Sequence, residues 1–143
     1  MHVFAILEQK GRAVETVRTD ATVMDVARKL ADKRIGAVVV LDSREDVAGI
    51  VSERDIIRVL GSHGVAALDW AVDAVMTSEV MTSSETDTIH ELASMMTTHR
   101  VRHLPVVESG RLVGIVSIGD VVKQHIAEVE LEAMAMRDYI TAG

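Results

Sequence analysis

Two stretches of the sequence, Gly49-Ile-Val-Ser-Glu-Arg-Asp55 and Gly114-Ile-Val-Ser-Ile-Gly-Asp120, share one pattern of glycine, two apolar residues, serine and aspartate. In both stretches an apolar run ends at the serine, and a pattern with helical spacing follows it. Ser52 and Ser117 are residue types that favour a helix N-cap. The two stretches therefore predict two strand-to-helix junctions built in the same way.

The similarity extends outward from these junctions. Thr22-Val-Met-Asp-Val-Ala27 aligns with Thr88-Ile-His-Glu-Leu-Ala93 at an offset of 66 positions, whereas the junctions align at an offset of 65. The slip of one residue falls after the apolar runs at 37–41 and 104–107, in polar segments typical of hairpin loops. A slip confined to a loop indicates that one unit has been duplicated.

Each copy has the pattern of a strand, a helix, two strands and a second helix. Apolar residues after Thr22 and Thr88 recur at helical spacing, and uninterrupted apolar runs follow them. Runs without alternation are typical of strands covered on both faces. Because a copy of about 50 residues has little core of its own, we expect a mixed α/β (α+β) fold in which two β-α-β-β-α repeats pack about a pseudo-twofold axis.

The expected boundaries follow from these patterns. We expect repeat 1 at 12–62, a connecting segment at 63–76, repeat 2 at 77–125 and a C-terminal helix at 126–143. Within the connecting region, Gly61 to Gly64 predict a flexible break and residues 68–76 predict a helix.

Two further segments flank the repeats. The helix that starts near Ile118 carries an apolar stripe that needs a cover, formed by Val121, Val122, Ile126, Val129 and Met134. The N-terminal apolar run, residues 3–7, is too short for a signal peptide or a spanning helix. We therefore expect a cytoplasmic protein without a membrane partner.

The composition excludes several kinds of partner. A formal net charge of -7 and an aromatic content of 2% do not suit nucleic acid, which binds basic surfaces and aromatic platforms. The chain has no cysteine, which excludes disulfides and thiolate zinc sites. His99 and His103 are four residues apart, but the expected helix ends near His99, so we expect no metal site.

The duplicated pattern resembles a stand-alone tandem CBS-domain pair, also called a Bateman module. The resemblance rests on the two glycine-to-aspartate stretches, on Arg100-Val-Arg-His-Leu-Pro-Val-Val107 and on Val75-Met-Thr77, and it covers roughly residues 12–125. It implies a non-catalytic regulatory module that binds an adenine nucleotide or a related adenosyl ligand (AMP, ATP, NAD or S-adenosylmethionine) in clefts between the repeats. It also implies a homodimer that signals in trans to a regulated protein that the sequence does not identify.

The residues at the two junctions suit such a ligand. Ser52 and Ser117 place a hydroxyl beside the backbone N–H groups of a helix start, which is a site for a phosphate. Asp55 and Asp120 offer two acceptor oxygens each, which suits the two hydroxyls of a ribose. Ser-x-x-Asp at a helix start is also a capping motif, although Asp is shorter than the Glu or Gln that this box prefers. Both interpretations stay open.

Other candidate residues follow from the resemblance. Arg102 and His103 would contact phosphate, and because repeat 1 has Gly36 and Ala37 there, two unequal sites are expected. Ordinary exposed side chains are the alternative for Arg102 and His103. The adenine pocket would be formed by Thr16, Ile35, Gly36, Ala37, Val38, Thr82, Val101, Leu104 and Pro105.

Two other functions compete with the nucleotide sensor. The first is a ligand-independent dimerisation or interaction module, suggested by the striped C-terminal helix. The second is an enzyme, which we do not expect because Ser52 and Ser117 lack a neighbouring base in any catalytic motif.

Overall fold

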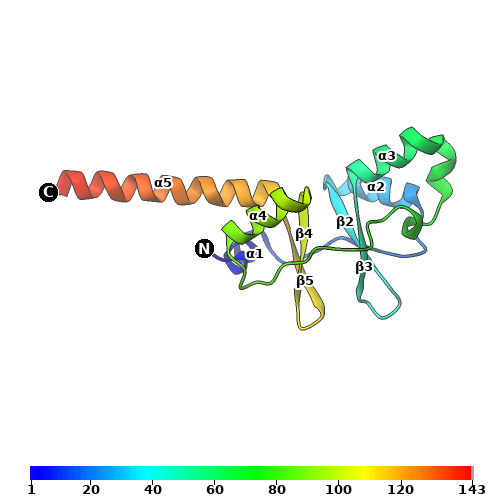
Figure 1. Cartoon of the computed structure of the whole chain (residues 1–143), viewed down its shortest axis with the longest axis horizontal. Coiled ribbons are helices and arrows are strands. Elements are labelled where there is room, and N and C mark those ends of the chain that lie inside the picture. Colours follow the sequence, from blue (N-terminus) through cyan, green and yellow to red (C-terminus); the bar gives the residue numbers. More distant parts are fainter. Residues whose placement is uncertain (143) are drawn as a thin grey trace.

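The computed structural model describes residues 1–142, which form two α/β units side by side and one long helix that extends away from the second unit (Figure 1). The first unit contains β1 (Thr16–Arg18), α2 (Val23–Lys33), β2 (Ala37–Leu41), β3 (Val47–Ser52) and α3 (Glu53–His63). Two 3₁₀ helices, η1 (Gly64–Asp69) and η2 (Val72–Ala74), follow it. The second unit contains α4 (Ile89–His99), β4 (His103–Glu108), β5 (Arg111–Ser117) and α5 (Ile118–Ala142), and α1 (Val3–Lys10) packs against it.

Repeat 1 is a three-stranded sheet with the order β1-β2-β3. β1 pairs with β2 in parallel and β2 pairs with β3 in antiparallel. The central strand β2 is buried from Ala37 to Val40, as its uninterrupted apolar run predicts. Its core joins residues of α2, β2, β3 and α3 to Ala67 and Val72 of the two 3₁₀ helices.

Repeat 2 has a sheet of only two strands, and the N-terminal helix α1 supplies part of its core. β4 and β5 form an antiparallel pair, and Ser83 makes an isolated parallel bridge to Val106 where repeat 1 has a whole strand. Val3, Ile6 and Leu7 of α1 are buried in the core of this repeat. The short N-terminal segment is therefore a structural part of repeat 2, which its sequence pattern did not predict.

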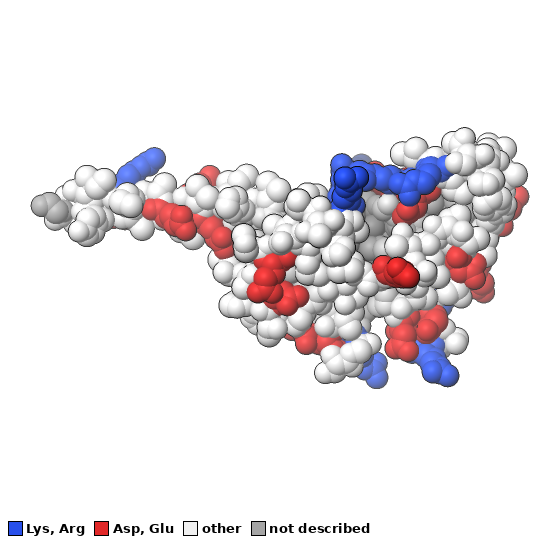
Figure 2. Space-filling model, in the orientation of Figure 1, with Lys and Arg blue, Asp and Glu red and all other residues white. Residues whose placement is uncertain are grey.

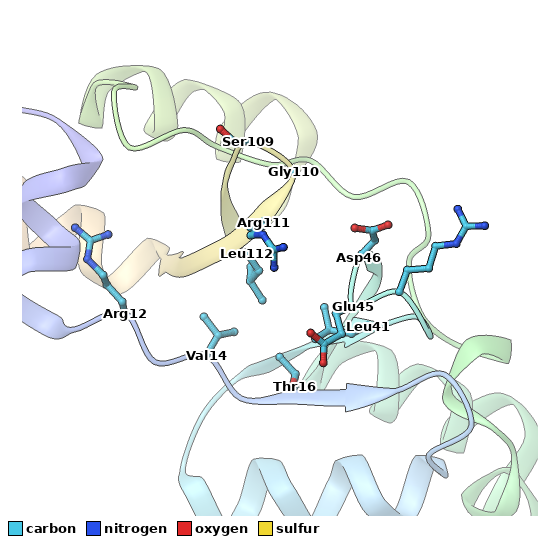
Figure 3. A pocket seen from close by; sticks show the side chains of 11 residues that line it. Arg12, Val14, Thr16, Leu41, Glu45, Asp46, Ser109, Gly110, Arg111 and Leu112 are labelled. Atoms are coloured by element: carbon cyan, nitrogen blue, oxygen red, sulfur yellow. The ribbon is translucent and has the colours of Figure 1, made fainter.

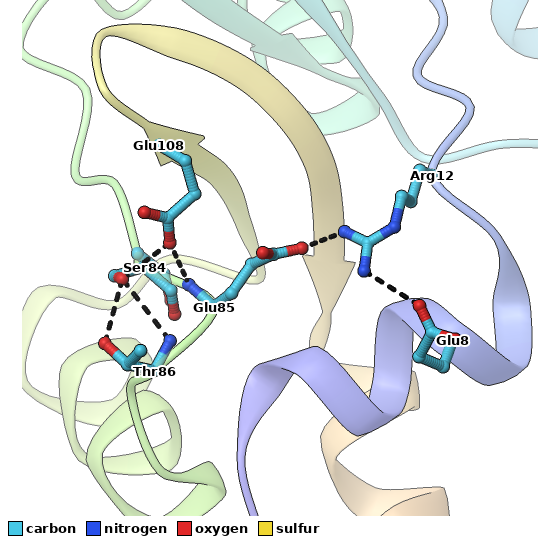
Figure 4. Close-up of polar contacts among 7 residues, drawn as sticks. Glu8, Arg12, Ser84, Glu85, Thr86 and Glu108 are labelled. Atoms are coloured by element: carbon cyan, nitrogen blue, oxygen red, sulfur yellow. Dashed lines mark hydrogen bonds and ion pairs between the residues drawn. The ribbon is translucent and has the colours of Figure 1, made fainter.

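Polar contacts hold this N-terminal segment in place (Figure 4). Arg12 donates hydrogen bonds to Glu8, at 3.0 Å, and to Glu85. Glu108 of β4 accepts hydrogen bonds from Ser84 Oγ and from the Glu85 backbone N–H, each at 2.7 Å. Residues 8–12 and 84–85 are thus tied to each other and to the sheet of repeat 2.

The expected mixed fold of two repeats is confirmed, with two local differences. The helix expected at 68–76 is replaced by the two 3₁₀ helices, with Trp70 extended between them. Gly61 and His63 remain within α3, so the chain breaks only at Gly64, where φ is 71°. The long helix expected from Ile118 is confirmed as α5, which continues without interruption to Ala142.

Among residues 1–142, no helix is both long enough and apolar enough to span a membrane.

Candidate functional site

A cavity of about 660 Å³ lies where the helix starts of the two repeats meet. β3 ends at Ser52 and β5 ends at Ser117, and each serine opens directly into a helix. Seven residues predicted to bind the ligand line this cavity, namely Gly36, Ser52, Asp55, Val101, Arg102, His103 and Ser117. The structure therefore brings together predicted residues from both repeats.

The first junction forms the complete capping box. The backbone N–H of Asp55 donates to Ser52 Oγ at 3.4 Å, and Asp55 Oδ2 accepts from the Ser52 backbone N–H at 2.8 Å. Ser52 Oγ lies 3.0 Å from the same Oδ2. The other oxygen, Oδ1, lies 3.8 Å from Arg58 Nη1 and accepts no hydrogen bond from the described residues. Capping therefore uses one carboxylate oxygen of Asp55 and leaves the second without a hydrogen bond from the described residues.

The second junction repeats the box and adds a cation. Asp120 Oδ2 accepts from the Ser117 backbone N–H at 2.9 Å and from Lys10 Nζ at 2.7 Å. The same ammonium donates to the Ile115 carbonyl at 2.8 Å. Asp120 is not among the residues that line the cavity. The two predicted ribose acceptors thus have different surroundings, because the N-terminal helix supplies an ion pair to only one of them.

The charge of Asp120 reflects these contacts. Burial acts to raise the pKa of its carboxyl, but the hydrogen bonds from Lys10 and Ser117 outweigh burial and hold the pKa below its usual value. Asp120 is therefore ionised at neutral pH. Sequence reasoning missed Lys10 because the two residues are 110 positions apart and only the docking of α1 joins them.

His103 of repeat 2 lies against Gly36 and Glu53 of repeat 1. A Cβ atom on Gly36 would lie 3.0 Å from His103 Nε2 and 3.4 Å from Glu53 Oε1, so the absence of a side chain on Gly36 makes room for the ring. Burial lowers the pKa of His103, and the carboxylates of Glu53 and Asp120 only partly oppose this effect. The ring is therefore predominantly neutral at pH 7.

Arginines from both repeats surround the cavity. Arg54 and Arg58 come from α3, and Arg100 and Arg102 come from the segment between α4 and β4. Figure 2 shows basic side chains gathered between α4 and α3 on a chain whose net charge is -7. Sequence reasoning assigned Arg102 to phosphate and named Arg54 and Arg100 as further candidates, but it missed Arg58, which lies one helical turn after Arg54. Four arginines against the three carboxylates of Glu53, Asp55 and Glu79 leave the lining with a small excess of positive charge, which favours a small anionic ligand.

The remaining predicted residues lie outside this cavity. Thr16 lines a second cavity of about 520 Å³ at the opposite, hairpin end of the strands, with Arg12 and Arg111 (Figure 3). Thr82 is exposed. The others belong to the buried or half-buried body of the sheets and not to the lining, namely Ile35, Ala37, Val38, Leu104 and Pro105.

The glycines that open the two junction stretches have a packing role. A Cβ atom on Gly49 would lie 2.8 Å from the Thr77 carbonyl oxygen, and one on Gly114 would lie 2.7 Å from Leu7 Cδ2. Gly49 of repeat 1 therefore makes room for the connecting segment that leads into repeat 2, and Gly114 of repeat 2 makes room for the N-terminal helix that leads into repeat 1. Their close approach is to protein rather than to the cavity.

Comparison with known proteins agrees with this architecture. The model of the CBS domain family matches residues 11–62 and again residues 72–126. The chain belongs to the CBS-domain family. The two matches make it a CBS pair, and the junctions at Ser52 and Ser117 each fall inside one of them.

Relatives of this CBS pair come from several organisms. A mitochondrial CBS domain-containing protein of Arabidopsis thaliana, CBSX3, is 31% identical over 96% of this chain and 71% of its own length. A CBS-domain containing protein from Agrobacterium tumefaciens has a solved structure with a TM-score of 0.83 and 43% identity, covering 85% of this chain and 91% of its own. A CBS domain protein from Pyrobaculum aerophilum, solved in complex with AMP, has a TM-score of 0.76 and 32% identity, covering 84% and 89%. Further curated relatives are longer, and the CBS pair spans between 21% and 66% of their length.

Proposed function

We propose that this CBS pair is a non-catalytic regulatory module that binds an adenine nucleotide, of the AMP, ATP or NAD kind, in the cavity between its repeats. The observation that carries the proposal is the meeting of Ser52, Asp55, Arg102, His103 and Ser117 around one cavity of about 660 Å³. The relative from Pyrobaculum aerophilum, whose structure contains AMP, supports the same ligand class. S-adenosylmethionine is the competing adenosyl ligand.

The cavity offers a distinct contact for each part of a nucleotide. Ser52 and the positive end of the α3 dipole suit a phosphate, and Arg102 adds a positive charge. Asp55 Oδ1 is directed away from the capping contacts and is the acceptor that we assign to a ribose hydroxyl. Val101 and Ile50 supply apolar lining for the base.

The module would transmit ligand binding to another protein in trans, from a cytoplasmic location. Its partner is unidentified, and we expect the chain to act as a homodimer. The second candidate function is a ligand-independent interaction module, which the exposed apolar residues of α5 favour. Titration calorimetry with AMP, ATP, NAD and S-adenosylmethionine separates the two functions, because only the first predicts binding. Well-folded protein that binds none of the four ligands at millimolar concentration would refute the first.

A matched pair of variants tests the role of Asp55. Asp55→Ala removes both the cap of α3 and the proposed ribose acceptor. Asp25→Ala removes the equivalent capping box of α2, in which Asp25 Oδ2 accepts from the Thr22 backbone N–H at 3.0 Å, and Asp25 does not line the cavity. Both variants should lose stability, because each loses the carboxylate half of a capping box.

Only the variant in the cavity should lose affinity. A hydrogen bond to a charged group contributes about 1.5–3 kcal/mol, so Asp55→Ala should weaken nucleotide binding by roughly tenfold or more. Asp25→Ala should bind as the unchanged chain does. Equal affinity of the two variants would contradict the assignment of Asp55.

A further inference from the structure

The second half of α5 is a helix without a packing partner among the described residues. Val121 and Gln124 are buried and fix the start of α5 on repeat 2. From Val129 to Ala142 every residue is exposed, and this part extends beyond α1 and α4 (Figure 1). A helical segment of this length is marginal in water unless an apolar face packs against something.

One face of this helix has the pattern of a coiled-coil seam. Its members follow one another at alternating spacings of four and three residues, namely Val122, Ile126, Val129, Ala133, Met136 and Ile140. The five large members are between 49% and 68% exposed. Alternation of four and three gives an average period of 3.5, in which Ile126, Ala133 and Ile140 occupy a positions and the others occupy d positions. We call this set the α5 seam.

The α5 seam differs from the stripe expected from the sequence alone. That stripe included Val121, which the structure buries against repeat 2, and Met134, which lies away from the seam. The residues that dock α5 on repeat 2 are thus separate from those of the seam. Repeat 2 therefore leaves the seam open to a partner helix.

We propose that residues 122–140 of α5 pair with the same segment of a second copy of this chain as a parallel, in-register, two-stranded coiled coil. The seam is narrow, because five of its six flanking e and g positions hold acidic or basic side chains; the e positions are Lys123, Glu130 and Arg137, and the g positions are His125, Glu132 and Tyr139. Charged flanks suit two strands, in which they stay at the border of the contact. The proposal specifies the surface of the expected homodimer and does not depend on nucleotide binding.

The charges at the flanks select the parallel orientation. In a parallel pair each g residue faces the e residue five positions later on the other helix. Glu132 then faces Arg137 of the second copy, and His125 faces Glu130 of the second copy. Symmetry doubles both contacts, and neither contact opposes like charges.

The antiparallel alternative opposes like charges at each charged pair. An antiparallel pair that keeps all six layers of the seam is centred on residue 131 and brings e to e and g to g. Glu130 then faces Glu130 of the second copy, Glu132 faces Glu132, and Lys123 faces Arg137. Both orientations bury the same apolar residues, so these charges decide between them.

Self-association of the full chain tests the seam. Val129→Glu places two carboxylates opposite each other inside the proposed coiled coil, and it should weaken dimerisation, measured by sedimentation equilibrium, by at least about tenfold. Leu131→Glu is the matched control, because Leu131 is 62% exposed on the opposite face of α5. This control should dimerise as the unchanged chain does. An unchanged chain that stays monomeric, or equal dimerisation of the two variants, would overturn the proposal.

Two further measurements test the orientation. Glu132→Arg and Arg137→Glu should each weaken the dimer, and the double variant should restore it, because only the parallel pairing joins these positions.

The chain has no cysteine, so Ile140→Cys should form a disulfide-linked dimer on mild oxidation. Antiparallel chains would hold the two sulfurs about 27 Å apart, and failure to cross-link in a dimeric sample would exclude the parallel arrangement. Calorimetry on Val129→Glu keeps the two proposals distinguishable, because this residue is remote from the cavity and nucleotide affinity should be retained.

Discussion

The imidazole of His103 lies half-buried between the repeats, where its titration should change the stability of the fold. Burial lowers the pKa of His103, Glu53 and Asp120 oppose this effect, and Lys10 and Arg102 add to it. In the unfolded chain the pKa of this imidazole is about 6.5. As the pH falls through this value, His103 binds its proton more readily in the unfolded chain than in the folded one. The contribution of His103 to the free energy of unfolding is therefore fully present above about pH 6.5 and is lost as the pH falls through the folded-state pKa.

The change in stability with pH that His103 can cause is limited, because the imidazole binds a single proton. The free energy of unfolding can change by no more than about 1.4 kcal/mol per pH unit for a single titrating group. Urea unfolding between about pH 5 and pH 8, on the unchanged chain and on His103→Gln, measures it. The variant keeps the other five histidines, so the difference between the two profiles isolates His103. A difference that stays constant over this range, or that grows in favour of the unchanged chain as the pH falls, would refute the reasoning.

The same group gives nucleotide binding a pH dependence of opposite sign. A phosphate beside His103 favours the protonated imidazole, so affinity should rise as the pH falls from about 7 to about 6. The gain is limited to about tenfold per pH unit for one proton. His103→Gln should remove that part of the dependence, whereas the titration of the phosphate itself remains in both proteins.

Three further substitutions test contacts that join α1 and the connecting segment to the repeats. Lys10→Met should cost about 1 kcal/mol of stability, because the ion pair at 2.7 Å is partly exposed. In an Asp120→Asn background the same change should cost less in urea unfolding, because only the contact with the Ile115 carbonyl is then lost in full. Gly114→Ala should cost about 1–3 kcal/mol through a clash with Leu7, and Leu7→Ala should cost less in that background than alone. Gly49→Ala places a Cβ atom 2.8 Å from a backbone carbonyl oxygen of the connecting segment, so no side-chain truncation should rescue it. Additive losses in the first two cycles would contradict these contacts.

Sequence patterns predicted the elements whose partners lie nearby in the chain. The apolar run at 37–41 pairs with the run at 47–52 across one short loop, so local pattern and structure agree. The helix starts at Thr22 and Ser52 were also predicted correctly, because a capping box involves only residues three positions apart. The break expected at Gly61 failed because tertiary packing of α3 overrides the weak helix propensity of one glycine.

The parts that were missed depend on contacts between distant segments. Nothing in residues 3–10 indicates that Leu7 completes the core of repeat 2 or that Lys10 reaches Asp120. In both repeats the sequence predicted only part of the cavity lining, and it missed Glu53 and Arg58 in repeat 1 and Ile118 and Gly119 in repeat 2. Val38 and Leu104 were assigned to the adenine pocket from the family pattern; their side chains are fully buried, and their assignment stays a prediction.

The capping and ribose-binding interpretations of Ser-x-x-Asp are compatible with each other. A capping box holds one carboxylate oxygen against the backbone N–H of the serine and thereby fixes the rotamer of the aspartate. At Asp55 this contact orients the second oxygen without occupying it, so the cap prepares the acceptor that a ribose would use. At Asp120 the same box is present, but Lys10 also forms an ion pair with the capping oxygen and offsets the negative charge of the carboxylate. The duplicated fold thus gives two identical caps, and the N-terminal helix makes the two aspartates chemically unequal.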